Sequence, residues 1–248
     1  MHQGDHKHTK MKVYIGFDDT DTIDAEAGTG KIARRFEALL PGGCRLWGVV
    51  RQQLLVDDRI PYTSHNSSAC AVIVLREPSQ AEELLSRAIA HIEKESAPGS
   101  DPGLCLAPEN GFSLSALMDF GVRCTKAIAS QEEALTAARG FHLSGHGGTN
   151  DGIIGAVAAV GLTAAGWSGR FIEFGRLRDL PDRVPVEELE RREMQVIPMD
   201  RDGIAPCAGD WVHTNGWLRP RLLGHKAVIA VAPAGPGLWR TLWEKRKK

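Results

Sequence analysis

The stretch VYIGFDDTDTIDAEAGTGKIARRF, residues 13–36, decides how the fold begins. An apolar run with the length of a buried strand ends abruptly at three carboxylates, Asp18, Asp19 and Asp21. The glycine-rich piece AGTGK then opens a pattern with apolar residues on one helical face, and PGG ends that pattern. Strand, acidic turn, glycine-rich loop and helix follow one another within a single short connection. This order would set an edge that can bind a metal beside an edge that can bind phosphate.

The acidic turn has two interpretations. Side chains alternate along a strand, so Asp19 and Asp21 are predicted to point to one side and Asp18 to the other. Two carboxylates on one side suit Mg²⁺, which takes oxygen ligands and keeps waters and phosphate oxygens as the rest. The alternative is a surface turn, because Asp and Thr favour turns and caps. The metal hypothesis assigns all three aspartates, Asp18, Asp19 and Asp21, to Mg²⁺ and to catalysis.

The AGTGK piece departs from the Walker A pattern at two positions. Ala25 stands in place of the first glycine, and Ile32 follows the lysine. A helix that begins here would still offer free N–H groups and a positive dipole end to an anion. The alternative is a flexible loop before a helix. The residues that we expect to hold phosphate are Gly28, Thr29, Gly30 and Lys31.

A second glycine-rich piece, SGHGGTNDGIIGA (144–156), also opens a helical pattern. The pattern is small and apolar all round, so it predicts a buried helix over 151–166 that packs closely through Gly155 and its alanines. The loop has two interpretations. It is a conformationally permissive loop that leads into the helix, or it supplies a second set of contacts to a phosphate or a nucleobase. In the latter case the candidate residues are Gly148, Asn150, Asp151 and Gly152.

Length and composition are those of a globular protein. The chain has 248 residues, 42% of them hydrophobic, and a net charge of −1, so it has no overall attraction for nucleic acid. Its five cysteines form no C-x-x-C pair, and we expect a reducing cytoplasm. No apolar run reaches the roughly 18–20 residues of a membrane span, and the polar start at 1–10 is predicted to be a disordered tail without a metal site.

Strand patterns alternate with helical ones, which predicts an α+β fold with mixed sheets flanked by helices. We expect strands at 12–17, 45–50, 69–75, 103–108 and 170–176, followed by short β runs at 193–199, 210–214 and 226–233. Helices are predicted over 30–40, 78–97 and 130–141, with capping boxes at Ser79–Glu82 and Ser130–Glu133. The domains would be 11–176 and a small β-rich extension over 177–248. The strand order does not follow from the pattern.

Four segments, in order, resemble one known family. GFDDTDT (16–22) is similar to GIDDTDS, IPYTSHNSSA (60–69) to IPYKTRGNGA, DPGLCLA (101–107) to a segment that begins NPG, and GGTNDGIIGAVAAVG (147–161) to GNGRGLIGALAAIG. The family is the kinase-like catalytic domain of archaeal isoleucine-tRNA agmatinylcytidine synthetase. The resemblance covers residues 11–176.

This resemblance implies ATP and Mg²⁺ as cofactors, bound through the aspartates of the DDTD motif. The family phosphorylates a cytidine carbonyl oxygen, which agmatine then displaces. A threonine in the loop after DDTD is also phosphorylated, and Thr29 is its nearest counterpart. The IPY segment would add Ser64, His65 and Asn66 to the nucleotide site.

The departures from the family leave the acceptor open. Lys and Arg of the KTRGN piece become Thr63 and His65, the arginine of GRG becomes Asp151, and neither the OB-fold nor the zinc ribbon of the full synthetase has a counterpart. We therefore expect a stand-alone ATP-dependent phosphotransferase or ligase-like enzyme. Its acceptor would be a nucleoside, an RNA or a small molecule, and a homo-oligomer is one possible assembly.

Two alternatives remain open. One is a nucleotide-binding regulatory module without catalysis, which the lost Lys and Arg favour. The other is a tRNA-binding protein, because aromatic and basic residues mix in one C-terminal segment and can stack on and clamp a nucleic acid. The residues concerned are Trp211, Trp217, Arg219, Arg221 and Lys226.

Overall fold

The structure, a computed structural model, describes residues 11–60, 65–110, 112–199 and 202–242. The predicted N-terminal tail therefore lies outside the described residues. The strands are β1 Met11–Asp18, β2 Arg45–Gln53, β3 Ser67–Leu75, β4 Gly103–Pro108, β5 His142–Gly145, β6 Arg170–Glu173, β7 Arg183–Pro185, β8 Met194–Pro198, β9 Trp211–His213, β10 Arg221–Leu223, β11 Lys226–Gly235 and β12 Leu238–Thr241. The helices are α1 Thr29–Arg35, α2 Ala81–Glu95, α3 Ser115–Cys124, α4 Gln131–Ala137, α5 Gly152–Ala165 and α6 Val186–Arg191, with 3₁₀ turns η1 Phe36–Leu39, η2 Pro78–Gln80 and η3 Leu177–Asp179.

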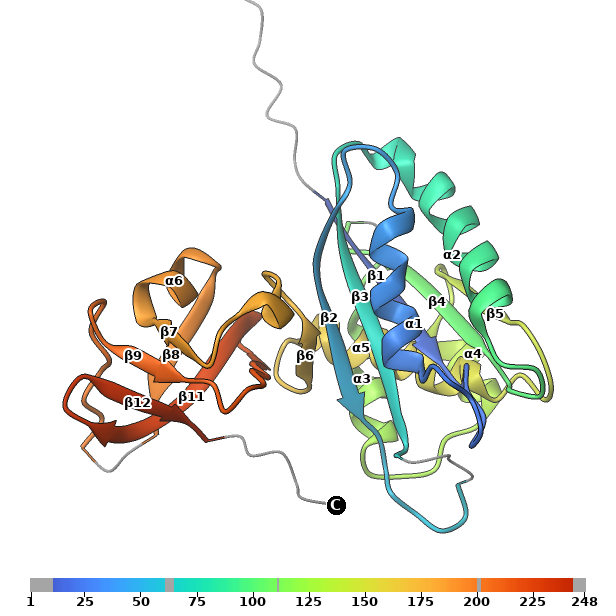
Figure 1. The fold of residues 1–248 in the computed structure, drawn as a ribbon. Coiled ribbons are helices and arrows are strands. Elements are labelled where there is room, and N and C mark those ends of the chain that lie inside the picture. The colour runs from blue at the N-terminus through green and yellow to red at the C-terminus, as the bar shows by residue number, and fades with distance from the viewer. Residues whose placement is uncertain (1–10, 61–64, 111, 200–201, 243–248) are drawn as a thin grey trace, which may run out of the picture.

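The first half of the chain forms a split β-α-β unit. Its elements follow the order β1-α1-β2-β3-α2-β4, and the strands lie side by side as β4-β1-β3-β2, each antiparallel to its neighbour. This is the ferredoxin-like arrangement. β5 extends the sheet beside β4, and β6 extends it beside β2 (Figure 1). Together with the helices, the sheet confirms the predicted α+β class.

Helices cover both faces of this sheet. Val13, Ile15 and Phe17 of β1 pack in one apolar cluster with α1 and α2, whereas Tyr14 packs in another cluster with α3, α4 and α5. The alternation explains why β1 reads as a continuous apolar run: side chains on both faces are buried.

Helix α5 approaches β1 and β4 unusually closely. A Cβ atom added to Gly16 would lie 2.1 Å from the carbonyl oxygen of Ala156, and one added to Gly103 would lie 2.1 Å from the carbonyl carbon of Gly152. The prediction of a buried helix at this position is confirmed, since nearly every residue of α5 is buried. The glycines on the strands let the first turns of α5 rest on the sheet backbone.

The last part of the chain forms a second lobe that continues the same sheet. β6 pairs with β10, and the order runs on through β11, β12, β9 and β7, with β8 parallel to β11 (Figure 1). The core of this lobe includes Val50 and Phe171 from the first lobe together with Leu189, Val212 and Trp239. The predicted β runs at 193–199, 210–214 and 226–233 are confirmed as β8, β9 and β11. The boundary at residue 176 stays a prediction.

Several local predictions are wrong. The capping box before α2 is formed by Glu77 and Gln80 rather than by Ser79 and Glu82, because Pro78 begins a 3₁₀ turn just ahead of the helix. The segment from His142 to Gly145, interpreted as loop, is strand β5, and α3 had no predicted counterpart. The Ser130–Glu133 capping box before α4 is confirmed.

The contact between β1 and α5 is testable by one substitution. We expect Gly16→Ala to lower the free energy of unfolding by at least about 1–3 kcal/mol, because the new methyl group meets backbone that cannot rotate away. The matched control is Gly42→Ala, since a Cβ at Gly42 has no atom within 4 Å. Urea unfolding measures both proteins. Equal midpoints for the two variants would contradict the close packing.

Candidate functional site

A cavity of about 770 Å³ opens where β1 ends and α1 begins. Its size is that of a typical ligand site. The first turn of α5, the connection between α3 and α4, and the segment that follows β2 complete its walls. The lining residues are Asp18, Asp19, Asp21, Thr22, Ile23, Thr29, Leu54, Arg59, Ile60, His65, Asn66, Ser67, Gly99, Ser100, Asp101, Cys124, Ala127, Ile128, Ala129, Ser130, Gln131, Asp151, Ile154 and Gly155.

Asp18 is the last residue of β1, and its carboxylate lies under the first turn of α5. A Cβ atom at Gly155 would lie 1.7 Å from Oδ2 of Asp18, so only glycine leaves room for this carboxylate. Burial, and then the neighbouring charge of Asp19, raises the pKa of Asp18 to about 8. A carboxylate in this position gains from a cation that shares the cavity.

Asp19 breaks the strand. Its φ angle of +50° is left-handed, so the alternation of β1 stops at Asp18. The prediction that Asp18 would point away from Asp19 and Asp21 is therefore wrong, since all three line the cavity. Burial and the charges of Asp101, Asp21 and Asp151, in that order, raise the pKa of Asp19 to about 6.

Asp21 holds the start of α1. Its Oδ1 accepts hydrogen bonds from the backbone N–H of Thr29 at 3.2 Å and from the Thr29 hydroxyl at 3.1 Å. The Thr29 oxygen in turn accepts from the hydroxyl of the buried Thr20 at 3.0 Å. A hydroxyl that donates to a carboxylate within a ligand cavity has the geometry of a nucleophile beside its base.

Asp101 is a site residue that the sequence analysis missed. It lies between α2 and β4, and its carboxylate accepts from the N–H and the hydroxyl of Thr149, both at 2.8 Å. Gly148 makes room for it, with φ +56° and a Cβ position only 1.2 Å from Oδ1 of Asp101. The only sequence signal was its place at the head of the DPG segment, which carried a resemblance but no role.

The predicted phosphate loop is only partly at the cavity. Thr29 lines it, whereas Gly28, Gly30 and Lys31 do not. Gly30 faces Ile172, since a Cβ there would lie 2.9 Å from that side chain, and Lys31 Nζ donates to the carbonyl of Glu26 at 3.4 Å. The amide of Thr29 already donates to Asp21, so α1 begins with that donor in use.

Of the four candidate residues in the second glycine-rich piece, Asp151 lines the cavity; Ile154 and Gly155, which follow in α5, also line it. The amides at the start of α5 donate to backbone carbonyls: Gly152 to Asp101, Ile153 to Asn150, and Ile154 to Asp151. Gly148, Asn150 and Gly152 therefore shape the loop around Asp101 and do not line the cavity.

Of the residues expected from the IPY segment, His65 and Asn66 line the cavity, and Ser64 lies outside the described residues. The Asn66 side chain donates to the carbonyl of Leu55 at 2.7 Å, and the backbone carbonyl of Asn66 accepts from the N–H of Leu54. These bonds clamp the segment that follows β2 onto the start of β3. Arg59, at the same rim, makes two hydrogen bonds of 2.8 Å to Asp57.

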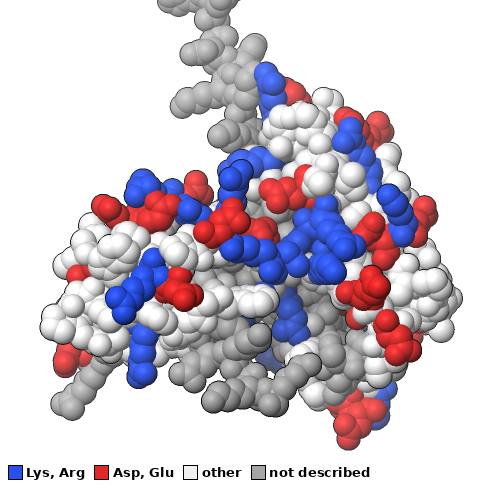
Figure 2. Space-filling model, viewed as in Figure 1, with Lys and Arg blue, Asp and Glu red and all other residues white. Residues whose placement is uncertain are grey.

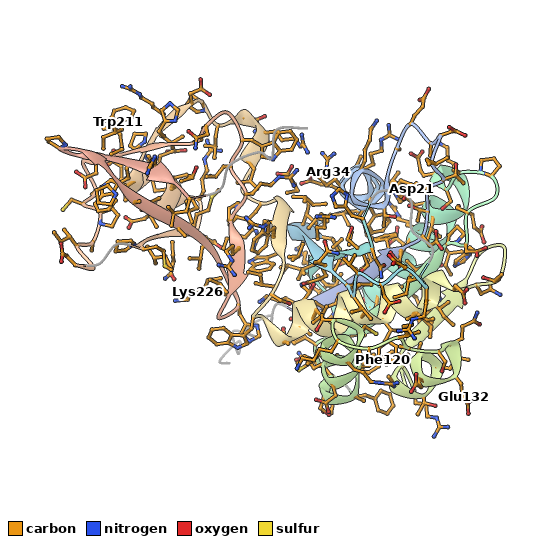
Figure 3. The ribbon with its side chains drawn as sticks, turned by 90° about the horizontal axis from the view of Figure 1, so that it is seen from below. Asp21, Arg34, Phe120, Glu132, Trp211 and Lys226 are labelled. Atoms are coloured by element: carbon orange, nitrogen blue, oxygen red, sulfur yellow. The ribbon has the colours of Figure 1, made fainter. Side chains whose placement is uncertain are left out.

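Apolar side chains also line the cavity, and the sequence pattern did not single them out. Leu54 and Cys124 are buried, Ile154 is half-buried, and Ile128 is 41% exposed. The segment around Ile128 joins α3 to α4, and neither its composition nor its spacing singled it out. The cavity thus combines an acidic rim with apolar side chains. In Figure 3, Asp21 lies away from Phe120 of α3 and Glu132 of α4, and all three belong to the first lobe.

The donor set fits Mg²⁺ in one particular way. Among the described residues, no three Asp, Glu, His or Cys side chains form a ready metal site, so joint ligation by Asp18, Asp19 and Asp21 is not pre-formed. Mg²⁺ commonly uses one or two carboxylates and completes its shell with phosphate oxygens and waters. The pKa values of Asp18 and Asp19 are raised, so these are the two carboxylates whose ionised form a bound cation would stabilise most.

The fold is shared with solved structures of a tRNA-modifying enzyme. A tRNA fluorescent labelling enzyme and the TiaS–tRNA–ATP complex each match with a TM-score of 0.54 and 23% identity, over 72% and 73% of this chain. The TiaS–tRNA–AMPCPP–agmatine complex matches with a TM-score of 0.51 and 23% identity over 73% of this chain. This chain spans 42%, 43% and 44% of those three chains, respectively.

No family model and no curated protein matches the sequence at a significant level. The common ground with TiaS is therefore the fold. Within the described part of the chain, no helix is both long enough and apolar enough to cross a membrane.

When no divalent cation is present, the crowded carboxylates should make the stability of the protein depend on pH. Folding raises the pKa of Asp18 and Asp19 to about 8 and about 6, from 3.8, so the folded state binds more protons between these values. The free energy of unfolding should therefore fall as pH rises from about 5 to about 8.5 in EDTA. Differential scanning fluorimetry measures this as a falling melting temperature.

Asp18→Asn is the control for that titration, because the amide keeps the shape of the carboxyl group without its charge. The melting temperature of this variant should fall less over the same range. Added Mg²⁺ should raise the melting temperature of the wild type more at the upper pH than at the lower one. Identical pH profiles for the wild type and the variant would show that Asp18 titrates normally.

Proposed function

We propose that this chain is an Mg²⁺- and ATP-dependent enzyme that transfers a phosphoryl group. The observation that carries the proposal is one cavity that is lined both by apolar side chains and by crowded carboxylates. A nucleotide offers a partner for each, a flat apolar base and a charged triphosphate. The solved TiaS complexes with ATP and AMPCPP share the fold and support this choice of ligand.

The base would lie against Leu54, Ile128 and Ile154, and the phosphates would lie toward the aspartates. Five carboxylates line the cavity, those of Asp18, Asp19, Asp21, Asp101 and Asp151. A bare triphosphate would be repelled there. Mg²⁺, when bound, would supply the charge that brings the phosphates to Asp18 and Asp19. Binding of ATP should therefore depend strictly on a divalent cation.

Within this chain, we assign the role of phosphoryl acceptor to Thr29. It lines the cavity, and its hydroxyl donates to Asp21, which would take the proton as the oxygen bonds to the γ-phosphorus of ATP and the bond from that phosphorus to the departing ADP breaks. The family resemblance assigns phosphorylation to a threonine in this loop, which agrees with the position of Thr29. Asp21 would then act on Thr29 and leave the metal to Asp18 and Asp19.

A second function, nucleotide binding without catalysis, is favoured by the scarcity of positive charge. Phosphoryl transfer needs cationic groups that stabilise the transferring phosphate. Among the described lining residues, the basic side chains are Arg59, which is paired with Asp57, and His65. Turnover separates the two functions: a catalyst labels Thr29 or an acceptor from ATP, whereas a regulatory module binds ATP and leaves both unlabelled.

Isothermal titration calorimetry tests the ATP site. The wild type should bind ATP with Mg²⁺ and lose binding in EDTA, and Asp19→Asn should weaken the Mg²⁺-dependent affinity by at least about tenfold, or 1.4 kcal/mol. The matched control is Asp24→Asn, because Asp24 is exposed in the same loop and does not line the cavity. Absence of ATP binding by the wild type, or equal affinities for the two variants, would overturn the proposal.

A further inference from the structure

Three arginines lie directly opposite one another on neighbouring strands. Arg51 of β2 pairs in register with Arg170 of β6, and Arg170 pairs with Arg221 of β10. Residues in such a row share one face of the sheet, with Cβ atoms about 5 Å apart, and like charges placed this way are destabilising. The row joins the two lobes, because β6 and β10 are the strands through which the sheet passes from one lobe to the other.

Three further arginines surround this row. Arg34 comes from α1, Arg178 from η3, and Arg219 from the residues just before β10. The guanidinium groups of Arg178 and Arg219 lie over the ring of Trp217, at 5.3 and 4.4 Å from its centroid. We call these six residues the arginine surface: Arg34, Arg51, Arg170, Arg178, Arg219 and Arg221.

The arginine surface carries little compensating negative charge. Glu173 lies 4.0 Å from Arg178, and within the described residues the other five arginines form no ion pair. Burial and four of the neighbouring arginines lower the pKa of Arg219 to about 10. Figure 2 shows Lys and Arg side chains gathered between the two lobes, with Asp and Glu side chains at the edge of the group; the chain as a whole has a net charge of −1. Such concentration of one sign is a binding feature rather than a stabilising one.

This surface reaches the rim of the acidic cavity. Nε of Arg51 donates to the hydroxyl of Ser67 at 2.9 Å, and Ser67 lines the cavity. Arg34 lies on the same helix as Thr29, and Figure 3 shows it on the side of the first lobe that faces the second. A ligand on the arginines would therefore lie beside a nucleotide in the cavity without competing for the same residues.

We propose that the arginine surface binds a ligand with several closely spaced phosphates, and that this ligand is the acceptor of the reaction. Planar guanidinium groups match phosphate oxygens with paired hydrogen bonds. The ring of Trp217 is already covered by two arginines, which favours recognition of phosphates over stacking of a base. The binding of phosphates stands on the arginines alone, whereas the role as acceptor rests on the proposed function.

The phosphates could belong to a small polyphosphorylated molecule or to an oligonucleotide, and the test uses a probe for each. Tripolyphosphate and a fluorescent single-stranded RNA of about ten nucleotides are titrated at low salt in EDTA. Without Mg²⁺ the acidic cavity repels anions, so binding reports on the arginine surface. RNA affinity should also fall as salt rises, because each neutralised phosphate releases a counterion.

The double variant Arg170→Gln, Arg221→Gln should weaken binding of the probe that binds the wild type by at least about tenfold. It removes two exposed like charges from the row, so its melting temperature should equal or exceed that of the wild type. The matched control is Arg45→Gln, an exposed arginine at the other end of β2, and it should bind as the wild type does.

Binding of tripolyphosphate alone identifies a small phosphorylated ligand, and binding of RNA alone identifies an oligonucleotide. The proposal is overturned when neither probe binds the wild type, or when the double variant binds as tightly as the Arg45→Gln control. ATP affinity with Mg²⁺ is measured on the same proteins. If the wild type does not bind ATP in the presence of Mg²⁺, the proposed enzyme function is wrong. Phosphate binding by the arginines is then judged from the probe titrations alone.

Discussion

The contact of α5 with the ends of β1 and β4 is the constraint on which the rest of the structure depends. Gly16 and Gly103 leave room on the sheet, and Gly155 leaves room on the helix, for a backbone approach that any side chain would prevent. The approach partly buries the carboxylate of Asp18 beneath the first turn of α5. The same packing that forms the hydrophobic core thereby holds a carboxylate in a state that costs stability and favours a cation.

The acidic rim is assembled from segments that are far apart in the sequence. Asp19 turns into the cavity because the chain becomes left-handed directly after β1, and Asp101 comes from the connection between α2 and β4. Asp151 comes from the loop before α5, where Gln131 of α4 donates to it at 2.6 Å. Crowded carboxylates beside apolar side chains lower the stability of the fold, so a purely structural region gains nothing from them. Such a combination suits a site that binds a nucleotide through a metal.

The sequence predicted the features that depend on local pattern. The strand at 12–17 was predicted from the length of its apolar run, and the capping box of Ser130 and Glu133 from their spacing. Asp18, Asp19 and Asp21 were found because carboxylates seldom follow a buried strand so closely. Their directions were predicted wrongly, because the left-handed φ angle of Asp19 ends the alternation and leaves no mark in the pattern.

Features that depend on strand order could not be read in advance. Asp101, Leu54 and Ile128 meet only because the sheet is ordered β4-β1-β3-β2 and because α3 and α4 pack on its α5 side. The pairing of Arg51 with Arg170 likewise depends on β6 adding to the edge at β2. Lys31 was expected at the phosphates from its place beside the glycines; it does not line the cavity, and its amine donates to the carbonyl of Glu26.

Two oppositely charged regions thus lie side by side, an acidic cavity and the arginine surface, and we assign the nucleotide to the cavity. The most direct test is a crystal structure of the full chain with ATP and Mn²⁺, in which anomalous scattering locates the metal. We expect Mn²⁺ bound by Asp18 or Asp19, with the base against Leu54 and Ile128. A triphosphate held by Arg170 and its neighbours, with no metal at the aspartates, would contradict it.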